Sequence, residues 1–475
     1  MWKMKQQSKM LSRIMLTVVI FASWFLAAKA TPTERGTAPN LNDFQLRPAT
    51  NQAELLDRVI KLDTKLPKLG VKNILEQANR HGEPSTSLET CNSDATARRT
   101  LSSASYCFNA SDSGKIGGEV EWMPQGVTTV GDAKTDQYWN TKQPILISWY
   151  DKKPKTPTNT DADKIKGARV TFFDPETAKY QHVLLVYPFI NSFGNVSYMS
   201  LRTTQKEGYD SLHAGGIAWY GNYLYVADTA RGFRVFDMRY IFDLKEAKNG
   251  DITDKNQIGY HNGKYYGHGY RYVMPEIAAW SSVVNRDSTK TCTLNAGSPT
   301  FSFTGVDRSG FPHLTTGEFC ADKIAAGDIN KSGRVARWPL DGNTGQPKLI
   351  NGLWKADAAY RLPISNIQGG VSYNNTWYLS RSQGASNGFL YVTKPITSTT
   401  GILEIDTAHY AAVGPEDLSH WPKADGSPGG LWTVSEHPGK RLLSTIEQER
   451  LSPLALINIE KDHQIDIDTI VTDFI

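Results

Sequence analysis

The chain has 475 residues, with 52 Lys and Arg against 48 Asp and Glu and a formal net charge of +4. Its basic residues are spread along the chain without a basic block, which argues against nucleic acid as a partner. The sequence holds 12 Trp, 21 Tyr and 39 Gly, and Val, Ile and Thr occur in short runs. This composition favours strands and turns over helices.

The first thirty residues have the pattern of a secretory signal peptide. Basic residues up to Arg13 precede an apolar run from Ile14 to Ala27, and the small residues Ala28 and Ala30 suit signal peptidase. The run is shorter than the ~18 residues that a membrane span needs. We predict residues 1–30 to be the signal peptide, an uncleaved anchor being the alternative. The mature protein is then expected to be secreted, either extracellular or periplasmic if the cell is Gram-negative, with no membrane span.

Four cysteines remain in the mature chain and form two local pairs. In an oxidising compartment this arrangement predicts the disulfides Cys91–Cys107 and Cys292–Cys320. A zinc site is the alternative, but the spacings are long and no His pair flanks the cysteines.

Residues 31–118 differ from the rest of the chain and are predicted to form a helical or irregular N-terminal extension. Apolar residues recur at helical spacing between Gln52 and Asn79. A helix is expected to start near Asn51, and Pro67 and Gly70 interrupt the pattern. Two short helices are therefore expected.

From residue 119 the pattern changes to short strands separated by turns. Five segments share one local pattern, a short strand followed by further strands: Pro124–Val127, Ala214–Ile217, Met274–Ile277, Gln368–Val371 and Pro415–Leu418. A repeated meander of three or four strands is typical of a propeller blade. We predict an all-β fold, a five-bladed β-propeller over residues 119–475. Six blades and a pair of sandwiches are the alternatives.

Glycines at several of these starts have a packing explanation. The innermost strands of a propeller converge on a central channel and leave little room for side chains. We therefore interpret Gly126, Gly215, Gly216, Gly369 and Gly370 as packing residues. None stands between a strand and a helix, as a phosphate-binding loop requires.

A resemblance supports this interpretation. It is carried by Ser211–Asn222, Tyr266–Tyr272, Gly333–Leu340 and Gly414–Leu418, and it extends to Leu46–Thr50. The chain resembles a group of largely uncharacterised secreted proteins of Streptomyces-type bacteria. The resemblance implies a secreted, β-propeller-like protein and assigns no catalytic residue.

The blade starts that are not glycine are the candidate site, because they surround the channel mouth of a propeller. They are Gln125, His213, Glu276, Gln368, Glu416 and Asp417. We predict Glu276, Glu416 and Asp417 as ligands of a Ca²⁺ ion, the one cofactor expected. Gln125, His213 and Gln368 are predicted to contact a bound ligand.

Two alternatives remain for the same residues. Glu276 with Glu416 or Asp417 could serve as acid and base, with His213 as a further catalytic candidate. Otherwise these side chains only hydrogen-bond the ends of the inner strands and seal the channel with water.

Other polar and aromatic residues have simpler expected roles. Asp228, Asp307 and Glu436 follow short strands and are expected to cap turns. Most aromatic residues, including Trp139, Trp149, Trp219, Tyr220 and Trp338, are expected to pack between blades, although any of them could stack on a sugar ring.

Three functions follow from this pattern. The first is a secreted propeller that binds a glycan or small molecule at its channel mouth. The others are a secreted hydrolase or lyase that uses the channel carboxylates, and an extracellular protein scaffold. The sequence carries no Gly-x-Ser-x-Gly elbow at a strand-to-helix turn and no His-Glu-x-x-His motif.

Overall fold

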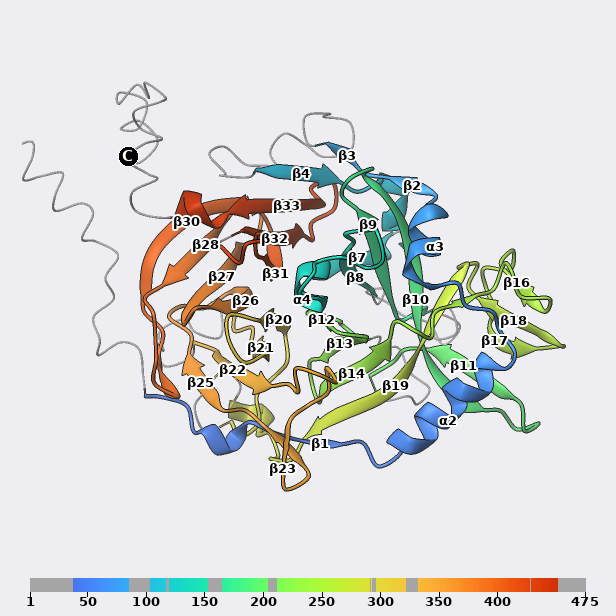
Figure 1. The fold of residues 1–475 in the computed structure, drawn as a ribbon, viewed down its shortest axis with the longest axis horizontal. Helices are drawn as coiled ribbons and strands as arrows, with labels where there is room; N and C mark the ends of the chain where they lie inside the picture. The colour runs from blue at the N-terminus through green and yellow to red at the C-terminus, as the bar shows by residue number, and fades with distance from the viewer. Residues whose placement is uncertain are drawn as a thin grey trace, which may run out of the picture.

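The computed structural model describes residues 37–84, 103–116, 119–152, 165–203, 212–290, 292, 296–321, 332–427 and 429–451. Within these ranges the chain consists mainly of strands, with three short α-helices (Figure 1). The predicted all-β class is therefore confirmed. Among the described residues, no helix combines the length and the apolar character that crossing a bilayer requires. The predicted signal peptide lies outside these residues.

Five antiparallel four-stranded meanders form the body of the molecule. The first consists of β7 (Trp122–Thr129), β8 (Ile145–Asp151), β9 (Ala168–Asp174) and β10 (Lys179–Ile190). The second consists of β12 (Ile217–Tyr220), β13 (Tyr223–Asp228), β14 (Gly232–Asp237) and β19 (Tyr272–Ser282). The third consists of β20 (Phe303–Asp307), β21 (His313–Gly317), β22 (Arg334–Pro339) and β25 (Ala358–Arg361).

The last two meanders follow closely in the sequence. The fourth consists of β26 (Ile367–Tyr373), β27 (Thr376–Gln383), β28 (Ser386–Thr393) and β30 (Ile405–Val413). The fifth consists of β31 (Pro415–Trp421), β32 (Gly430–Ser435), β33 (Leu442–Glu447) and β4 (Ala104–Cys107). Its outer strand β4 comes from the N-terminal part of the chain, so this part meets the last described strand, β33, in one sheet.

The remaining strands are short; most extend these sheets at their edges, and five form two small separate sheets, one of three strands and one of two. These short strands are β1 (Gln45–Pro48), β2 (Arg80–His81), β3 (Glu83–Pro84), β5 (Lys115–Ile116), β6 (Glu119–Val120), β11 (Val196–Ser200), β15 (Phe242–Asp243), β16 (Gly250–Asp251), β17 (Ile258–His261), β18 (Lys264–Gly267), β23 (Leu349–Ile350), β24 (Leu353–Lys355) and β29 (Thr400–Ile402). A parallel pairing of β10 with β19 joins the first two meanders into one larger sheet.

The first strands of the five meanders lie next to one another in the middle of the molecule (Figure 1). Strand β7 contacts β12, β12 contacts β20, β20 contacts β26, β26 contacts β31, and β31 contacts β7. The glycines predicted to be packing residues lie at these contacts. A Cβ on Gly126 would stand 2.7 Å from the backbone nitrogen of Ile217, and one on Gly216 would stand 2.1 Å from that of Thr304. Only glycine allows the strands to approach so closely.

A short helix lies among these first strands. Helix α4 (Val130–Ala133) follows β7 directly and contacts β7, β12 and β31. Its Asp132 is buried and accepts hydrogen bonds from the hydroxyls of Thr128 (2.8 Å) and Ser419 (2.6 Å) and from the backbone N–H of Thr129 (3.3 Å). Helix α4 is therefore fixed to the first strands of two meanders.

The N-terminal part of the chain contains the two predicted helices, α2 (Gln52–Asp63) and α3 (Gly70–Glu76). Helix α2 buries Leu55, Val59 and Leu62 and contacts β10 and β19, because these residues share one face at helical spacing. The strands β1 to β4 of the same region pair with strands of the meanders. This part of the chain therefore packs along the body of the molecule.

One predicted start of a meander is wrong. The segment Met274–Ile277 lies in β19, the outer strand of the second meander, and the third meander instead begins at Phe303. Phe303 takes the place where glycine was expected. Its ring fits there because Gly317 and Gly370 leave room, since a Cβ on either residue would approach the ring to 2.0 and 2.9 Å.

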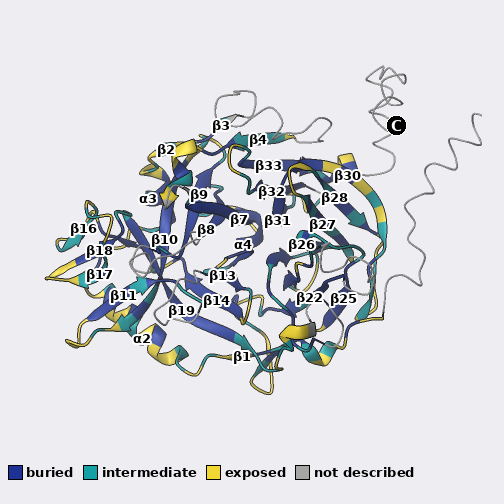
Figure 2. Ribbon diagram, turned by 180° about the vertical axis from the view of Figure 1, so that it is seen from behind, coloured by how far each residue is buried: buried dark blue, intermediate teal, exposed yellow. Residues whose placement is uncertain are grey.

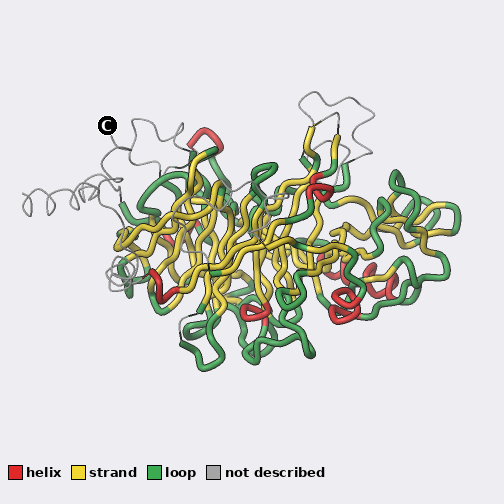
Figure 3. The backbone as a smooth tube through the Cα atoms, turned by 90° about the horizontal axis from the view of Figure 1, so that it is seen from above, coloured by secondary structure: helices red, strands yellow, loops and turns green. Residues whose placement is uncertain are grey.

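The interior is apolar and rich in aromatic side chains, and Figure 2 shows that the inner strands are buried. Trp149, Trp219, Trp338 and Trp377 are almost fully buried, as expected for packing residues. Seen from the edge, the strands form a band and many loops lie at its borders (Figure 3). Polar side chains that lie where strands end can therefore gather at either border.

A buried chain of hydrogen bonds fixes the turn of residues 110–113 to the first meander. The indole of Trp149 donates to the Thr171 hydroxyl (2.8 Å), which lies 2.8 Å from Nδ1 of His182. Nε2 of His182 lies 3.0 Å from the Asp112 carboxylate. Burial lowers the pKa of His182 to about 3. A neutral imidazole then accepts from Thr171 and donates to Asp112, so this network is structural.

One predicted disulfide is confirmed. Cys292 and Cys320 are bonded, with their Cα atoms 5.9 Å apart. The bond connects the segment after β19 to the end of β21. Cys91 of the other predicted pair lies outside the described residues, so the Cys91–Cys107 pairing stays a prediction.

Candidate functional site

Several predicted site residues meet where the first strands begin. The carboxamide of Gln125 donates to Glu436 (2.9 Å), and that of Gln368 donates to Glu416 (3.2 Å). These residues come from three meanders. With Tyr150 and His213 they form a set that we call the mouth cluster: Gln125, Tyr150, His213, Gln368, Glu416 and Glu436.

Glu416 is the most unusual member of the mouth cluster. It is 2 % exposed. Burial raises the pKa of its carboxyl well above the ordinary value, and the negative charges of Glu436 and Asp417 raise it further. Among the described residues, the carboxamide of Gln368 is the one side chain that donates to this carboxyl. Burial thus favours the neutral form of Glu416 beside a second carboxyl group, and a cation that entered would favour release of its proton.

Glu436 has a different environment, although it interacts with Glu416. Its side chain is 21 % exposed and accepts a hydrogen bond from Gln125. Arg441 donates to the backbone oxygen of Glu436 (3.2 Å) and keeps a charge nearby, although burial lowers the pKa of Arg441 to about 10. The two carboxyl groups of the mouth cluster are therefore not equivalent.

Tyr150 and His213 provide an aromatic side to the cluster. Their ring centroids are 4.3 Å apart. Burial raises the pKa of the Tyr150 phenol, and Glu436 and Glu416 add to the effect. The His213 side chain reaches solvent, yet desolvation by the surrounding protein lowers the pKa of its imidazole to about 4. The imidazole is therefore neutral at pH 7.

Asp417 lies beside Glu416 but is turned toward the backbone. One carboxylate oxygen accepts from the backbone N–H groups of Val127 (3.4 Å) and Ile217 (3.2 Å). Asp417 therefore connects β31 to β7 and β12, which fits the structural alternative. Its other oxygen, Oδ1, has no hydrogen-bond partner among the described residues.

Glu276 does not belong to the mouth cluster, and the predicted convergence of Glu276 with Glu416 and Asp417 is wrong. It lies in β19, which β13 and β14 separate from the first strand β12, a distance of about 14 Å at the usual strand spacing. Glu276 is buried and ion-paired with Arg234 (3.2 Å), which also binds Asp228 (2.9 Å). Burial raises the pKa of Glu276 to about 6 against the attraction of Arg234. This group is a buried structural ion pair.

Two members of the mouth cluster were not predicted as site residues. Glu436 was expected to cap a turn and Tyr150 to pack between blades. A signal for Glu436 exists in hairpin register, because Pro415 pairs with Ser435 and so places the residue after β32 beside the start of β31. Tyr150 lies in β8 opposite Met123 of β7, so the register of this hairpin places it near Gln125.

The cluster is chemically suited to a hard cation or to a hydroxyl-rich ligand. Its two carboxyl and two carboxamide groups supply oxygen atoms of the kind that Ca²⁺ binds. Among the described residues, no group of three or more His, Cys, Asp or Glu side chains is close enough to hold a metal ion. A cation there would have to use the carboxamides or the ligand itself for further coordination.

Comparison with protein-family models finds no match, and comparison with curated proteins finds no similar sequence. We therefore infer function from the geometry of the site.

Proposed function

We propose that this chain is a secreted five-bladed β-propeller whose mouth cluster binds a glycan or another small hydroxyl-bearing molecule together with a Ca²⁺ ion. Five meanders whose first strands contact one another in a closed sequence support the propeller. The signal-peptide pattern and the Cys292–Cys320 disulfide support secretion.

The environment of Glu416 carries the proposal for the site. A carboxyl group that is buried beside a second carboxyl group, with one neutral donor, is costly to ionise. A Ca²⁺ ion between Glu416 and Glu436 would stabilise both charges at once. The carboxamide oxygens of Gln125 and Gln368 would supply further ligands after these side chains turn. A hydroxyl-bearing ligand could complete the coordination and pack against Tyr150 and His213.

Neither alternative function is taken further. The hydrolase or lyase hypothesis needs Glu276 paired with Glu416 or Asp417 in a water-accessible site. All three side chains are buried, and Glu276 is ion-paired in another strand. No observation favours the scaffold hypothesis.

A ligand screen tests the proposal. The secreted protein is applied to glycans and small polyols in Ca²⁺ and again in EDTA. We expect a ligand whose binding is lost both in EDTA and in the double variant Glu416→Gln, Glu436→Gln. Glu404→Gln is the matched control, because Glu404 is exposed and pairs with Lys394 on the surface. Ligand binding that neither EDTA nor the double variant weakens would contradict a Ca²⁺-dependent mouth site.

A further inference from the structure

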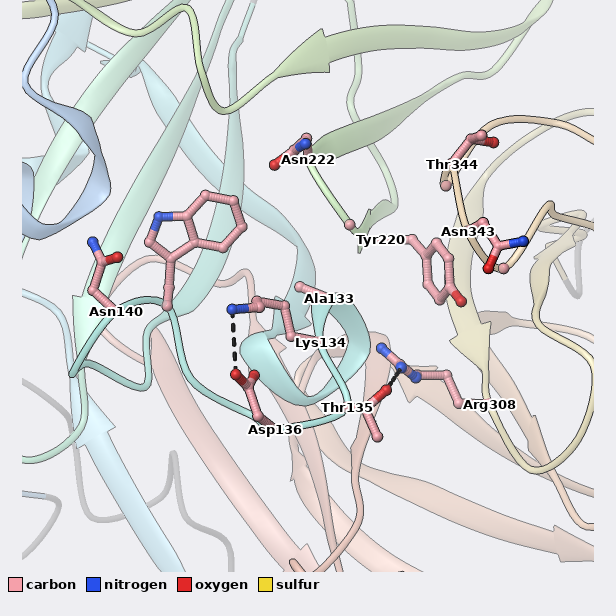
Figure 4. A pocket seen from close by; sticks show the side chains of 14 residues that line it. Ala133, Lys134, Thr135, Asp136, Asn140, Tyr220, Asn222, Arg308, Asn343 and Thr344 are labelled. Atoms are coloured by element: carbon pink, nitrogen blue, oxygen red, sulfur yellow. Dashed lines mark hydrogen bonds and ion pairs between the residues drawn. The ribbon is translucent and has the colours of Figure 1, made fainter.

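A pocket of about 630 Å³ lies beside helix α4, at the ends of the first strands opposite to the mouth cluster (Figure 4). We call it the α4-side pocket. It is formed by four segments: residues 133–140 after α4, residues 220–222 between β12 and β13, Arg308 after β20, and residues 342–345. Its volume lies within the range of about 300–1,000 Å³ that is usual for ligand sites.

Three carboxamide side chains line this pocket: Asn140, Asn222 and Asn343. Figure 4 shows Asn222 and Asn343 on opposite segments, with Tyr220 between them. Within the described part of the chain, none of the three carboxamide groups takes part in a hydrogen bond, and only backbone atoms of Asn222 and Asn343 do so. Each carboxamide can both donate and accept, which suits a ligand with many hydroxyl groups.

The pocket also has aromatic walls. Trp139 is partly exposed and packs against the buried Trp219, with ring centroids 4.9 Å apart. Tyr220 is 6 % exposed and lies under the guanidinium of Arg308 at 5.0 Å. A flat ring held in place by packing offers a surface for the C–H face of a sugar at little entropic cost.

Each of the three charged residues of the pocket already contacts a neighbouring group. Lys134 forms an ion pair with Asp136 (3.3 Å). Arg308 donates to the backbone oxygen of Asp132 (2.8 Å) and to the Thr135 hydroxyl (2.6 Å). Figure 4 draws the Lys134–Asp136 ion pair and the Arg308–Thr135 hydrogen bond as dashed lines. Lys134 and Asp136 offset each other, while Arg308 keeps its positive charge and donates to neutral oxygens of Asp132 and Thr135, so the pocket offers mainly hydrogen bonds and aromatic surface.

We propose that the α4-side pocket is a second binding site, which takes a neutral oligosaccharide. The sugar ring packs against Trp139, and its hydroxyl groups bond to Asn140, Asn222 and Asn343. This site needs no metal ion and lies at the other end of the first strands from the mouth cluster. It is therefore independent of the proposed Ca²⁺ site.

The test uses the whole secreted protein with neutral gluco-, manno-, xylo- and N-acetylglucosamine oligosaccharides, in EDTA, by calorimetry and tryptophan fluorescence. We expect at least one of these oligosaccharides to bind and to change the fluorescence. The double variant Asn222→Ala, Asn343→Ala should weaken that binding by about tenfold or more, since two hydrogen-bonding groups are lost. Its melting temperature should not change, because neither carboxamide forms a hydrogen bond within the described part of the chain.

Two further variants make the result specific. Trp139→Phe keeps an aromatic ring and should weaken binding by less than Trp139→Ala. Asn256→Ala removes an exposed carboxamide elsewhere and should leave binding unchanged. The variant Glu416→Gln, Glu436→Gln should also bind normally, which separates this site from the mouth cluster. The proposal is overturned if no neutral oligosaccharide binds in EDTA, or if the Asn222→Ala, Asn343→Ala variant binds like the wild type.

Discussion

Two buried carboxyl groups at opposite ends of the first strands differ in how they are paired. Asp132 in α4 accepts hydrogen bonds from two hydroxyls and a backbone N–H, while Glu416 accepts from one carboxamide and lies near two further carboxyl groups. Burial raises the pKa of both, to about 6 for Asp132. The hydrogen bonds of Asp132 fix α4 in place, whereas Glu416, with one donor and two carboxyl neighbours, is the group that would gain from a bound cation.

The largest expected effect is on the close packing of the first strands, which positions both the mouth cluster and helix α4. In Gly216→Ala the new methyl group would stand 2.1 Å from the backbone nitrogen of Thr304. Backbone must then move, and we expect a loss of about 3 kcal/mol in the free energy of unfolding, measured with urea.

Gly310→Ala is the matched control for this change, because nothing lies within 4 Å of a Cβ at that position. It should change stability by less than about 0.5 kcal/mol. Equal effects of the two substitutions would mean that the first strands are not packed as closely as described.

A smaller effect on stability is expected at Asp132. Asp132→Ala leaves the hydroxyls of Thr128 and Ser419 without their acceptor in a buried place. We expect a loss of about 2 kcal/mol in the free energy of unfolding. Asp136→Ala, an exposed neighbour, should cost much less. If the two variants are equally stable, Asp132 does not fix α4 to the first strands.

The opposite effect on stability is expected at the mouth cluster, where removal of a carboxyl group should stabilise the folded protein. The folded-state pKa of Glu416 is above its unfolded value of about 4.3, so the folded protein holds a proton that the unfolded chain releases. This costs stability as pH rises above about 4.3 toward the folded pKa, by up to about 1.4 kcal/mol per pH unit. Glu416→Gln removes the cost.

Urea unfolding in EDTA at several pH values measures this difference. The variant Glu416→Gln should match the wild type near pH 4 and become progressively more stable than the wild type as the pH rises toward the folded-state pKa of Glu416. A difference that is constant with pH would show that Glu416 titrates normally in the folded protein.

Much of the fold could be predicted from local sequence, and the errors have physical causes. The packing glycines marked three first strands correctly, because close backbone contact leaves few other residues possible at Gly126, Gly216 and Gly369. The start of the third meander was predicted wrongly, because a close contact between two strands needs a small residue on only one of them. Phe303 is accommodated by glycines on the neighbouring strands. The segment around Glu276 resembles the start of a first strand, but it lies in the outer strand β19.

The candidate site could be predicted in part. Gln125, His213, Gln368 and Glu416 lie near the starts of first strands, and their neighbourhood follows from the repeat. Glu436 and Tyr150 reach the same place from other strands, and the partner of β4 is the distant strand β33. The pairing of β4 with β33 joins segments far apart in the chain, which no local spacing encodes, whereas hairpin register places Glu436 and Tyr150.

The most direct test of the central claim is calorimetric titration of the metal-free protein with Ca²⁺. We expect a single ion to bind per chain, and we expect binding to be absent in Glu416→Gln, Glu436→Gln and retained in Glu404→Gln. If the wild type takes up no Ca²⁺, or if the double variant binds it as well as the wild type does, the mouth cluster is not a Ca²⁺ site.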